Sequence, residues 1–246
     1  MEYYVIYFFL TLTLSTLFSM GGVGSAIGLV PIFSMMDMPL NLAKAIGLFI
    51  NSASTVTASV MNFFRGVLDI GFALPLIISI LLTTPIGAYA SQYIEKEIVE
   101  WVLVIFILVS ASLLIFSNRE IKVVYDKAWI MYLIGGSVGL ISGMIGVGGG
   151  AIIMPLLILL GFDAKKAAYA VSFVIPFSSI GAFSTYLSFV DMDWKLLGVV
   201  SVAAIIGGYL GDRIMHYRLT PKQVKKLIAV VLLLLAAKMI YKLLGV

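Results

Sequence analysis

The fold is decided by ten residues, GVGGGAIIMP at positions 146–155, which recur 124 positions earlier as GVGSAIGLVP at positions 22–31. Each copy lies inside a largely apolar stretch that contains no Asp, Glu, Lys or Arg. The stretch 128–162 has 35 residues, and the stretch 3–36 has 34. About 20 residues suffice for a helix to cross the roughly 30 Å hydrocarbon core of a bilayer, so each stretch is too long for one straight span. The glycines therefore predict a broken or re-entrant helix at the same place in both stretches.

The spacing of 124 residues continues beyond the glycines without a gap. It pairs Pro31 with Pro155 and Asp69 with Asp193. Chance explains some matches between two apolar segments, but not glycines, a proline and an aspartate at one offset. We therefore predict two transmembrane repeats, 1–122 and 123–246, joined by the polar stretch 118–127. Further pairs at this offset are Met20 with Met144, Ala43 with Ala167, Ser54 with Ser178, Ala58 with Ala182 and Gly87 with Gly211.

The composition excludes a water-soluble domain, because 62% of the residues are hydrophobic, 11% are charged and the mean hydropathy is +1.14. Stretches almost free of charge mark the membrane spans, since a charge at the centre of a span is costly. The predicted fold is an all-α integral membrane protein with about eight transmembrane segments in two tandem repeats, located as a multi-pass protein in the cell membrane. The segments are 3–36, 45–64, 70–94, 101–118, 128–162, 167–190, 196–211 and 227–237.

Neither a metal nor a cofactor is expected. Cysteine is absent, which excludes disulfides and thiolate ligands, and His216 is the one histidine of the chain. The net charge of +4 comes from Lys and Arg in loops, where it serves membrane orientation and gives no reason to expect nucleic-acid binding.

The basic residues predict an orientation that depends on the number of crossings. If all eight segments cross, nine Lys and Arg share one side against seven on the other, which places the loop 213–226 in the cytoplasm and both termini outside. If a glycine break makes a re-entrant hairpin, the repeats become inverted rather than parallel. The nine residues are Lys44, Lys96, Lys165, Lys166, Arg213, Arg218, Lys222, Lys225 and Lys226.

The glycine segments are the first candidate for substrate binding. Glycines permit backbone conformations that leave N–H groups outside the helical ladder, and an anion at the start of a half-helix is one partner for them. The alternative is close helix packing, to which we assign Gly135, Gly139, Gly143, Gly207 and Gly211. The candidates for the anion site are Gly22, Gly24, Ser25, Gly146, Gly148, Gly149 and Gly150.

The second segment of each repeat adds polar side chains inside an apolar run. Hydroxyl groups often bond carbonyls of their own helix, so each taken singly favours a structural role. Their density, and their matched positions in the two repeats, instead favour a polar lining that faces the glycines. The candidates are Ser52, Ser54, Thr55, Asn62, Ser172, Ser178 and Ser179, with Asn51 in the same run.

Charged candidates are few. Lys44 and Arg65 flank the second segment, Lys165 and Lys166 precede its counterpart, and Asp69 and Asp193 form a repeat-matched pair. We predict interfacial anchors or loop caps for all of them, with substrate attraction or proton coupling as the minority role.

These residues resemble the TauE/SafE family of sulfite and organosulfonate exporters. The resemblance rests on the glycine segments ending in Pro31 and Pro155, on the stretch NLAKAIG at 41–47 and on the helices of Gly87 and Gly211, and it covers essentially the whole chain. It implies two repeats of about four membrane helices that move sulfur-containing anions. The first repeat departs from the pattern, with Ser25 in place of a glycine and Leu48-Phe49 in place of a Thr-Ser pair; only Ser172 keeps part of that pair in the second.

The sequence favours a secondary transporter that exports sulfite or an organosulfonate. Its partners would be a small anionic solute and the lipid bilayer, and a homo-oligomer stays open. A passive anion channel or a membrane assembly subunit is the alternative. An intramembrane enzyme is the least favoured class, since Asp212 is expected at the end of a span without a mid-span partner and His216 in a loop.

Overall fold

The computed structural model describes residues 2–116, 127–218 and 220–244, and the regular structure in these residues is helical, which confirms the all-α class. The first half contains α1 (Glu2–Ser19), α2 (Ala26–Met35), α3 (Leu40–Phe64), α4 (Ile70–Ala90), the short 3-10 helix η1 (Ser91–Tyr93) and α5 (Lys96–Phe116). The second half contains α6 (Ala128–Ile145), α7 (Gly150–Leu159), α8 (Ala164–Tyr186), α9 (Trp194–Arg218) and α10 (Pro221–Leu243).

The outer surface of the bundle suits a bilayer. Five helical stretches, corresponding to α4 with η1, α5, α6, α8 and α9, are long and apolar enough to cross one. Large apolar side chains such as Leu82, Ile105 and Leu133 are more than half exposed on these helices, which is costly in water and favourable in lipid. The prediction of a multi-pass membrane protein is confirmed, whereas eight separate crossings are not.

Both overlong stretches are broken at their glycines, as predicted. Residues 20–25 separate α1 from α2, and residues 146–149 separate α6 from α7. The helix α2 turns back along α1, since the rings of Tyr7 and Phe33 lie 4.8 Å apart and the Phe18 ring fills the space beside Gly28. The stretch 3–36 is therefore a re-entrant hairpin and not a single span.

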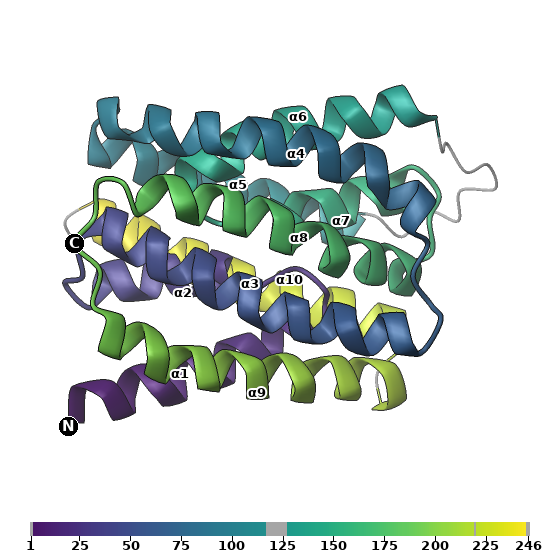
Figure 1. Cartoon of the computed structure of the whole chain (residues 1–246), viewed down its shortest axis with the longest axis horizontal. Helices are drawn as coiled ribbons and strands as arrows, with labels where there is room; N and C mark the ends of the chain where they lie inside the picture. The colour runs from purple at the N-terminus through teal and green to yellow at the C-terminus, as the bar shows by residue number, and fades with distance from the viewer. Residues whose placement is uncertain (1, 117–126, 219, 245–246) are drawn as a thin grey trace.

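The two halves of the chain run in opposite directions through the bundle. Figure 1 shows both ends of the chain on one side, whereas α5 ends and α6 begins on the opposite side. Each half contributes one hairpin and three long helices, α3 to α5 or α8 to α10. If these three long helices cross the membrane and the hairpin does not, the number of crossings per half is odd and the repeats are inverted rather than parallel.

Glycines bring the helices together where close packing was predicted. The helix α4 lies on α6, α1 lies on α9, and α3 and α8 pack together between these pairs (Figure 1). A side chain at Gly87 would overlap the backbone of Leu140, and one at Gly211 would overlap the backbone of Thr16, which stands 124 positions before Leu140. The packing role predicted for five glycines is confirmed, because a Cβ at Gly135, Gly139, Gly143, Gly207 or Gly211 would overlap the facing helix.

The end of α9 corrects two predictions. The helix continues to Arg218, so His216 is helical and does not lie in a loop. Asp212 has no exposed surface, because α9 turns its carboxylate toward Arg65 at the end of α3. The charged residues after Gly211 therefore belong to the helix and do not mark its end.

The predicted grouping of basic residues is also wrong, because each hairpin changes the side on which the next helix begins. Lys44 and Lys96 lie at one end of the bundle, together with Lys195, Lys238 and Lys242 (Figure 1). The opposite end holds nine of the described basic residues, so the contrast is nine against five. These nine are Arg65, Lys127, Lys165, Lys166, Arg213, Arg218, Lys222, Lys225 and Lys226.

Candidate functional site

The two glycine turns have backbone conformations that favour glycine. The φ angles of Gly22 and Gly24 are 63° and 83°, and those of Gly146, Gly148 and Gly149 lie between 75° and 77°. Residues with a Cβ rarely adopt these left-handed values. The glycines predicted to break the spans therefore shape the turns directly.

Four backbone N–H groups in the turns donate no hydrogen bond within the described part of the chain. They belong to Gly24 and Ser25 before α2 and to Gly148 and Gly149 before α7. All four residues are buried, and neither N-cap residue, Ser25 or Gly149, caps its helix with a side chain of its own. Buried donors without partners are costly, and the start of a helix carries partial positive charge, so both turns suit a bound anion.

Asn51, in the middle of α3, touches both turns. Its Nδ2 donates to Ser179 Oγ over 2.8 Å, and its Oδ1 accepts the N–H of Ala26 over 3.3 Å. A Cβ at Gly24 or at Gly148 would overlap this amide, so the absence of a side chain lets both turns reach it. Asn51 belongs to the polar run predicted from the sequence but was not among the predicted site residues.

The predicted polar residues divide into two groups. Ser25, Ser178 and Ser179 lie near the turns, where Ser178 Oγ is 3.3 Å from Thr84 Oγ1 and Ser25 Oγ is buried without a partner among the described residues. The others have local roles or lie away from Asn51. Ser54 and Thr55 bond the carbonyl of Asn51, Ser172 bonds that of Tyr169, and Asn62 accepts from Arg65. The Ser52 hydroxyl bonds none of the described residues.

Lys44 is buried, with 1% of its surface exposed, and the prediction that it anchors the chain at the interface is wrong. Gly146 has no side chain, so the stem of Lys44 lies directly on the second turn. The Nζ atom lies 5.5 Å from the centre of the Tyr186 ring and 3.5 Å from Asn41 Oδ1. No carboxylate of the described residues lies within 4.0 Å of this nitrogen, so its charge lacks a direct counter-ion.

The other charged candidates are explained by local contacts. Asp69 accepts the N–H of Phe72, and Asp193 accepts those of Lys195 and Leu196, which confirms both aspartates as caps. Arg65 is not a simple anchor, since it forms an ion pair with the buried Asp212.

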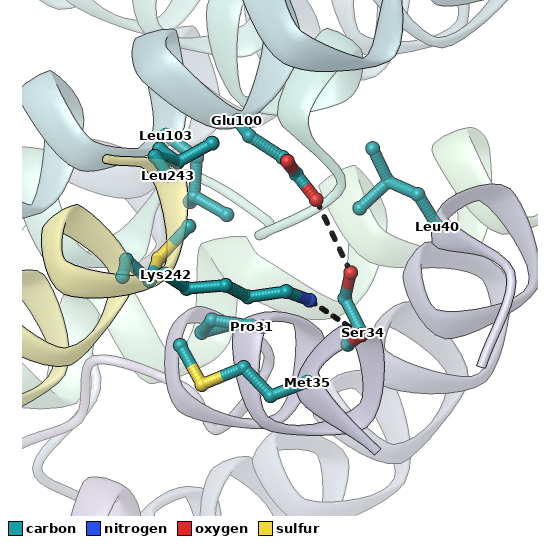
Figure 2. Close-up of a pocket in the computed structure, with 9 residues that line it drawn as sticks. Pro31, Ser34, Met35, Leu40, Glu100, Leu103, Lys242 and Leu243 are labelled. Atoms are coloured by element: carbon teal, nitrogen blue, oxygen red, sulfur yellow. Dashed lines mark hydrogen bonds between the residues drawn. The ribbon is translucent and has the colours of Figure 1, made fainter. Parts of the chain in front are cut away.

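A small pocket between α2, α5 and α10 lies apart from the turns (Figure 2). Its polar groups bond one another: Lys242 Nζ donates to the carbonyl of Ser34 over 3.0 Å, and Ser34 Oγ donates to Glu100 Oε1 over 3.3 Å. None of the predicted site residues lines it, so the turns remain the better candidate. The lining consists of Pro31, Ser34, Met35, Leu40, Glu100, Leu103, Met239, Lys242 and Leu243.

Known proteins resemble the chain over most of its length. Residues 7–239 match the family model described as sulfite exporter TauE/SafE. A probable membrane transporter protein of Methanocaldococcus jannaschii is 26% identical over 239 residues, which cover 87% of this chain and 86% of the relative. The probable membrane transporter protein YunE of Bacillus subtilis is 26% identical over 178 residues, which cover 64% of this chain and 65% of the relative.

Proposed function

The chain belongs to the sulfite exporter TauE/SafE family, and from that membership we propose a secondary transporter that exports a small oxyanion, with sulfite or an organosulfonate as substrate. The broader class needs no proposal, since the family and both relatives identify a membrane transporter and not an enzyme.

The observation that carries this proposal is the set of four unbonded N–H groups in the turns before α2 and α7. An oxyanion of sulfur presents several acceptor oxygens around one centre, and hydrogen bonds from backbone N–H groups can replace the water that it loses. Both turns reach Asn51, and the hydroxyl of Ser25 adds one more buried donor. We place the anion between the two turns, beside this amide.

Lys44 is the cation that we assign to the substrate. A buried ammonium group with no carboxylate in contact is costly, and an anion beside the second turn would offset its charge. The counterpart of Lys44 at the offset of 124 is Ala168, which lies against Gly22 of the first turn. The two proposed repeats would thus contribute unequally, with the cation on the side of the second turn.

The burial of the site supports alternating access over a passive pore. Gly24, Ser25, Asn51, Gly148 and Ser179 are all buried, so the turns open to neither face of the membrane. A transporter passes through such an occluded state between its inward-open and outward-open states, whereas a conducting channel has a continuous path.

The test is transport by the purified protein in liposomes, with sulfite, sulfoacetate, sulfate and thiosulfate as solutes and with an imposed pH gradient. We expect saturable flux and counterflow for at least one of them. Flux that does not saturate would indicate a channel, and no flux above that of empty liposomes for any of the four would refute the proposed substrate class.

A further inference from the structure

A second polar cluster lies where α3 and α9 end, on the side opposite to the chain termini (Figure 1). An Arg65 nitrogen donates to Asp212 Oδ2 and, over 3.2 Å, to Asn62 Oδ1. The Asp212 side chain is fully buried, whereas 18% of the Arg65 side chain is exposed. Within the described residues this is the one ion pair with a fully buried carboxylate.

The hydrogen bonding of this pair is incomplete. Asp212 Oδ1 and Asn62 Nδ2 are buried and have no hydrogen-bond partner among the described residues. A buried carboxylate oxygen that accepts no hydrogen bond is costly, because no water replaces the missing donor. A proton on Oδ1 would remove that cost, and among the described residues Arg65 is the one positive side chain that forms an ion pair with Asp212.

The pair also lies beside the residues that lead into the first glycine turn. Gly211, the neighbour of Asp212, packs against Thr16, Ser19 and Met20 at the end of α1, directly before the turn. Arg65 connects α9 to α3 at this level. Separation of the pair would therefore loosen the contact of α9 with α3 beside the turn that we assign to the anion.

Further polar and charged side chains lie next to this pair. His216 follows Asp212 by one helical turn and is partly exposed, and its Nδ1 lies 3.0 Å from the hydroxyl of Tyr169 on α8. Lys165 on α8 adds a positive charge through its bond to the carbonyl of His216, over 3.4 Å. On the side of α1, the uncharged Ser15 and Ser19 lie against Gly207 and Gly211 of α9.

We propose that Asp212 is the proton-binding residue that couples anion movement to protons, and that Arg65 is its partner in the empty transporter. A proton taken from water binds Asp212 Oδ1, and the ion pair is lost. Arg65 then pairs with one negative charge of the passing anion, so no charge is left alone. When the anion leaves, the proton leaves Asp212 and the pair re-forms. One proton therefore crosses the membrane together with the negative charge that pairs with Arg65.

The proton-binding step can be tested without any solute, because the chain lacks cysteine. Ser19→Cys introduces one thiol beside Gly211, and a membrane-impermeant maleimide in vesicles reports access to it. We expect labelling from the face where α9 ends to be about tenfold faster in mildly acidic than in mildly alkaline buffer. Added to Ser19→Cys, Asp212→Asn should label fast in both buffers, and Asp191→Asn, at an exposed loop residue, should keep the dependence on pH.

Asp212→Asn leaves Arg65 unpaired and could unfold the protein, so the double change Arg65→Gln with Asp212→Asn gives a second, charge-neutral test. If the double variant folds, the thiol of Ser19→Cys in it should also be labelled fast in both buffers. Labelling that does not depend on pH in the parent, or that still depends on pH in both variants, would overturn the proposal.

The coupling of proton movement to anion transport rests on the proposed function and is measured separately. In liposomes that transport sulfoacetate, a trapped pH indicator should record proton movement with the parent, whereas Asp212→Asn should exchange sulfoacetate for sulfoacetate without moving protons. Proton movement by Asp212→Asn equal to that of the parent would contradict the coupling. If no oxyanion is transported at all, the proposed function fails while the thiol test still decides the proton-binding step.

Discussion

Asn51 is the residue at which the two glycine turns meet, and sequence reasoning passed over it. Repetition guided the choice of candidates, and the position 124 residues after Asn51 is Ile175, so no matched pair pointed to the amide. Lys44 was named as a charged candidate, but substrate attraction was only its minority role, and its counterpart at the same offset is Ala168. A residue that serves only one of the two predicted repeats leaves no mark in the repeat pattern.

At the residue scale, a substitution of Ser25 distinguishes a role in anion binding from a role in helix packing. Its hydroxyl is buried without a partner, so Ser25→Ala should leave the thermal unfolding temperature unchanged or raise it. If the hydroxyl serves the anion, the same change should raise the KM for flux about tenfold, since a hydrogen bond to a charged group contributes about 1.5–3 kcal/mol.

The matched control for Ser25 is Ser15→Ala. Ser15 is equally buried and equally without a partner for its hydroxyl, but it faces Gly207 of α9 and not a glycine turn. We expect normal flux from it. An equal loss of flux in both variants would mean that Ser25 has no special role in binding.

Lys44 should contribute charge to the same site. Lys44→Gln keeps a polar side chain of similar reach but removes the cation, and we expect the KM for the transported oxyanion to rise about tenfold or more. Lys195→Gln, at an exposed position of α9, is the control and should leave the KM unchanged. Unaltered flux kinetics in Lys44→Gln would exclude the lysine from binding.

At the scale of elements, composition and glycine spacing predicted most of the fold. The helical class, the two breaks and the packing glycines are confirmed, because apolar runs and paired glycines report local physics directly. The direction of the chain after each break was not predictable, since a kink and a hairpin need the same glycines. That choice depends on contacts such as Tyr7 with Phe33, which bring together residues on different helices.

The hairpins make a prediction about topology. Lys127 before α6 and Asp191 before α9 lie on opposite sides of the membrane if each half contains one hairpin, and on the same side if all eight segments cross. We expect single cysteines at these positions to react with an impermeant maleimide from opposite faces, Lys127→Cys from the cytoplasmic one. Reaction of both from the same face would contradict the hairpins.

At the scale of the whole molecule, the distribution of basic residues between the two ends of the bundle predicts the orientation in the membrane. Nine described basic residues gather at the end that holds the Arg65–Asp212 pair, against five at the end that holds the chain termini. Because cytoplasmic loops are enriched in Lys and Arg, we expect the first end in the cytoplasm. The proton-binding pair would then face the compartment from which an exported anion enters.

The central proposal is that the glycine turns before α2 and α7 present their unbonded N–H groups to one oxyanion beside Asn51. Its most direct test is oxyanion flux in liposomes that contain Asn51→Asp, which keeps the shape of the side chain and adds a negative charge. Gln92→Glu makes the same change at an exposed position of η1 and serves as the control. We predict at least about a tenfold loss of flux with Asn51→Asp and none with Gln92→Glu; parental flux from a folded Asn51→Asp protein would contradict the site.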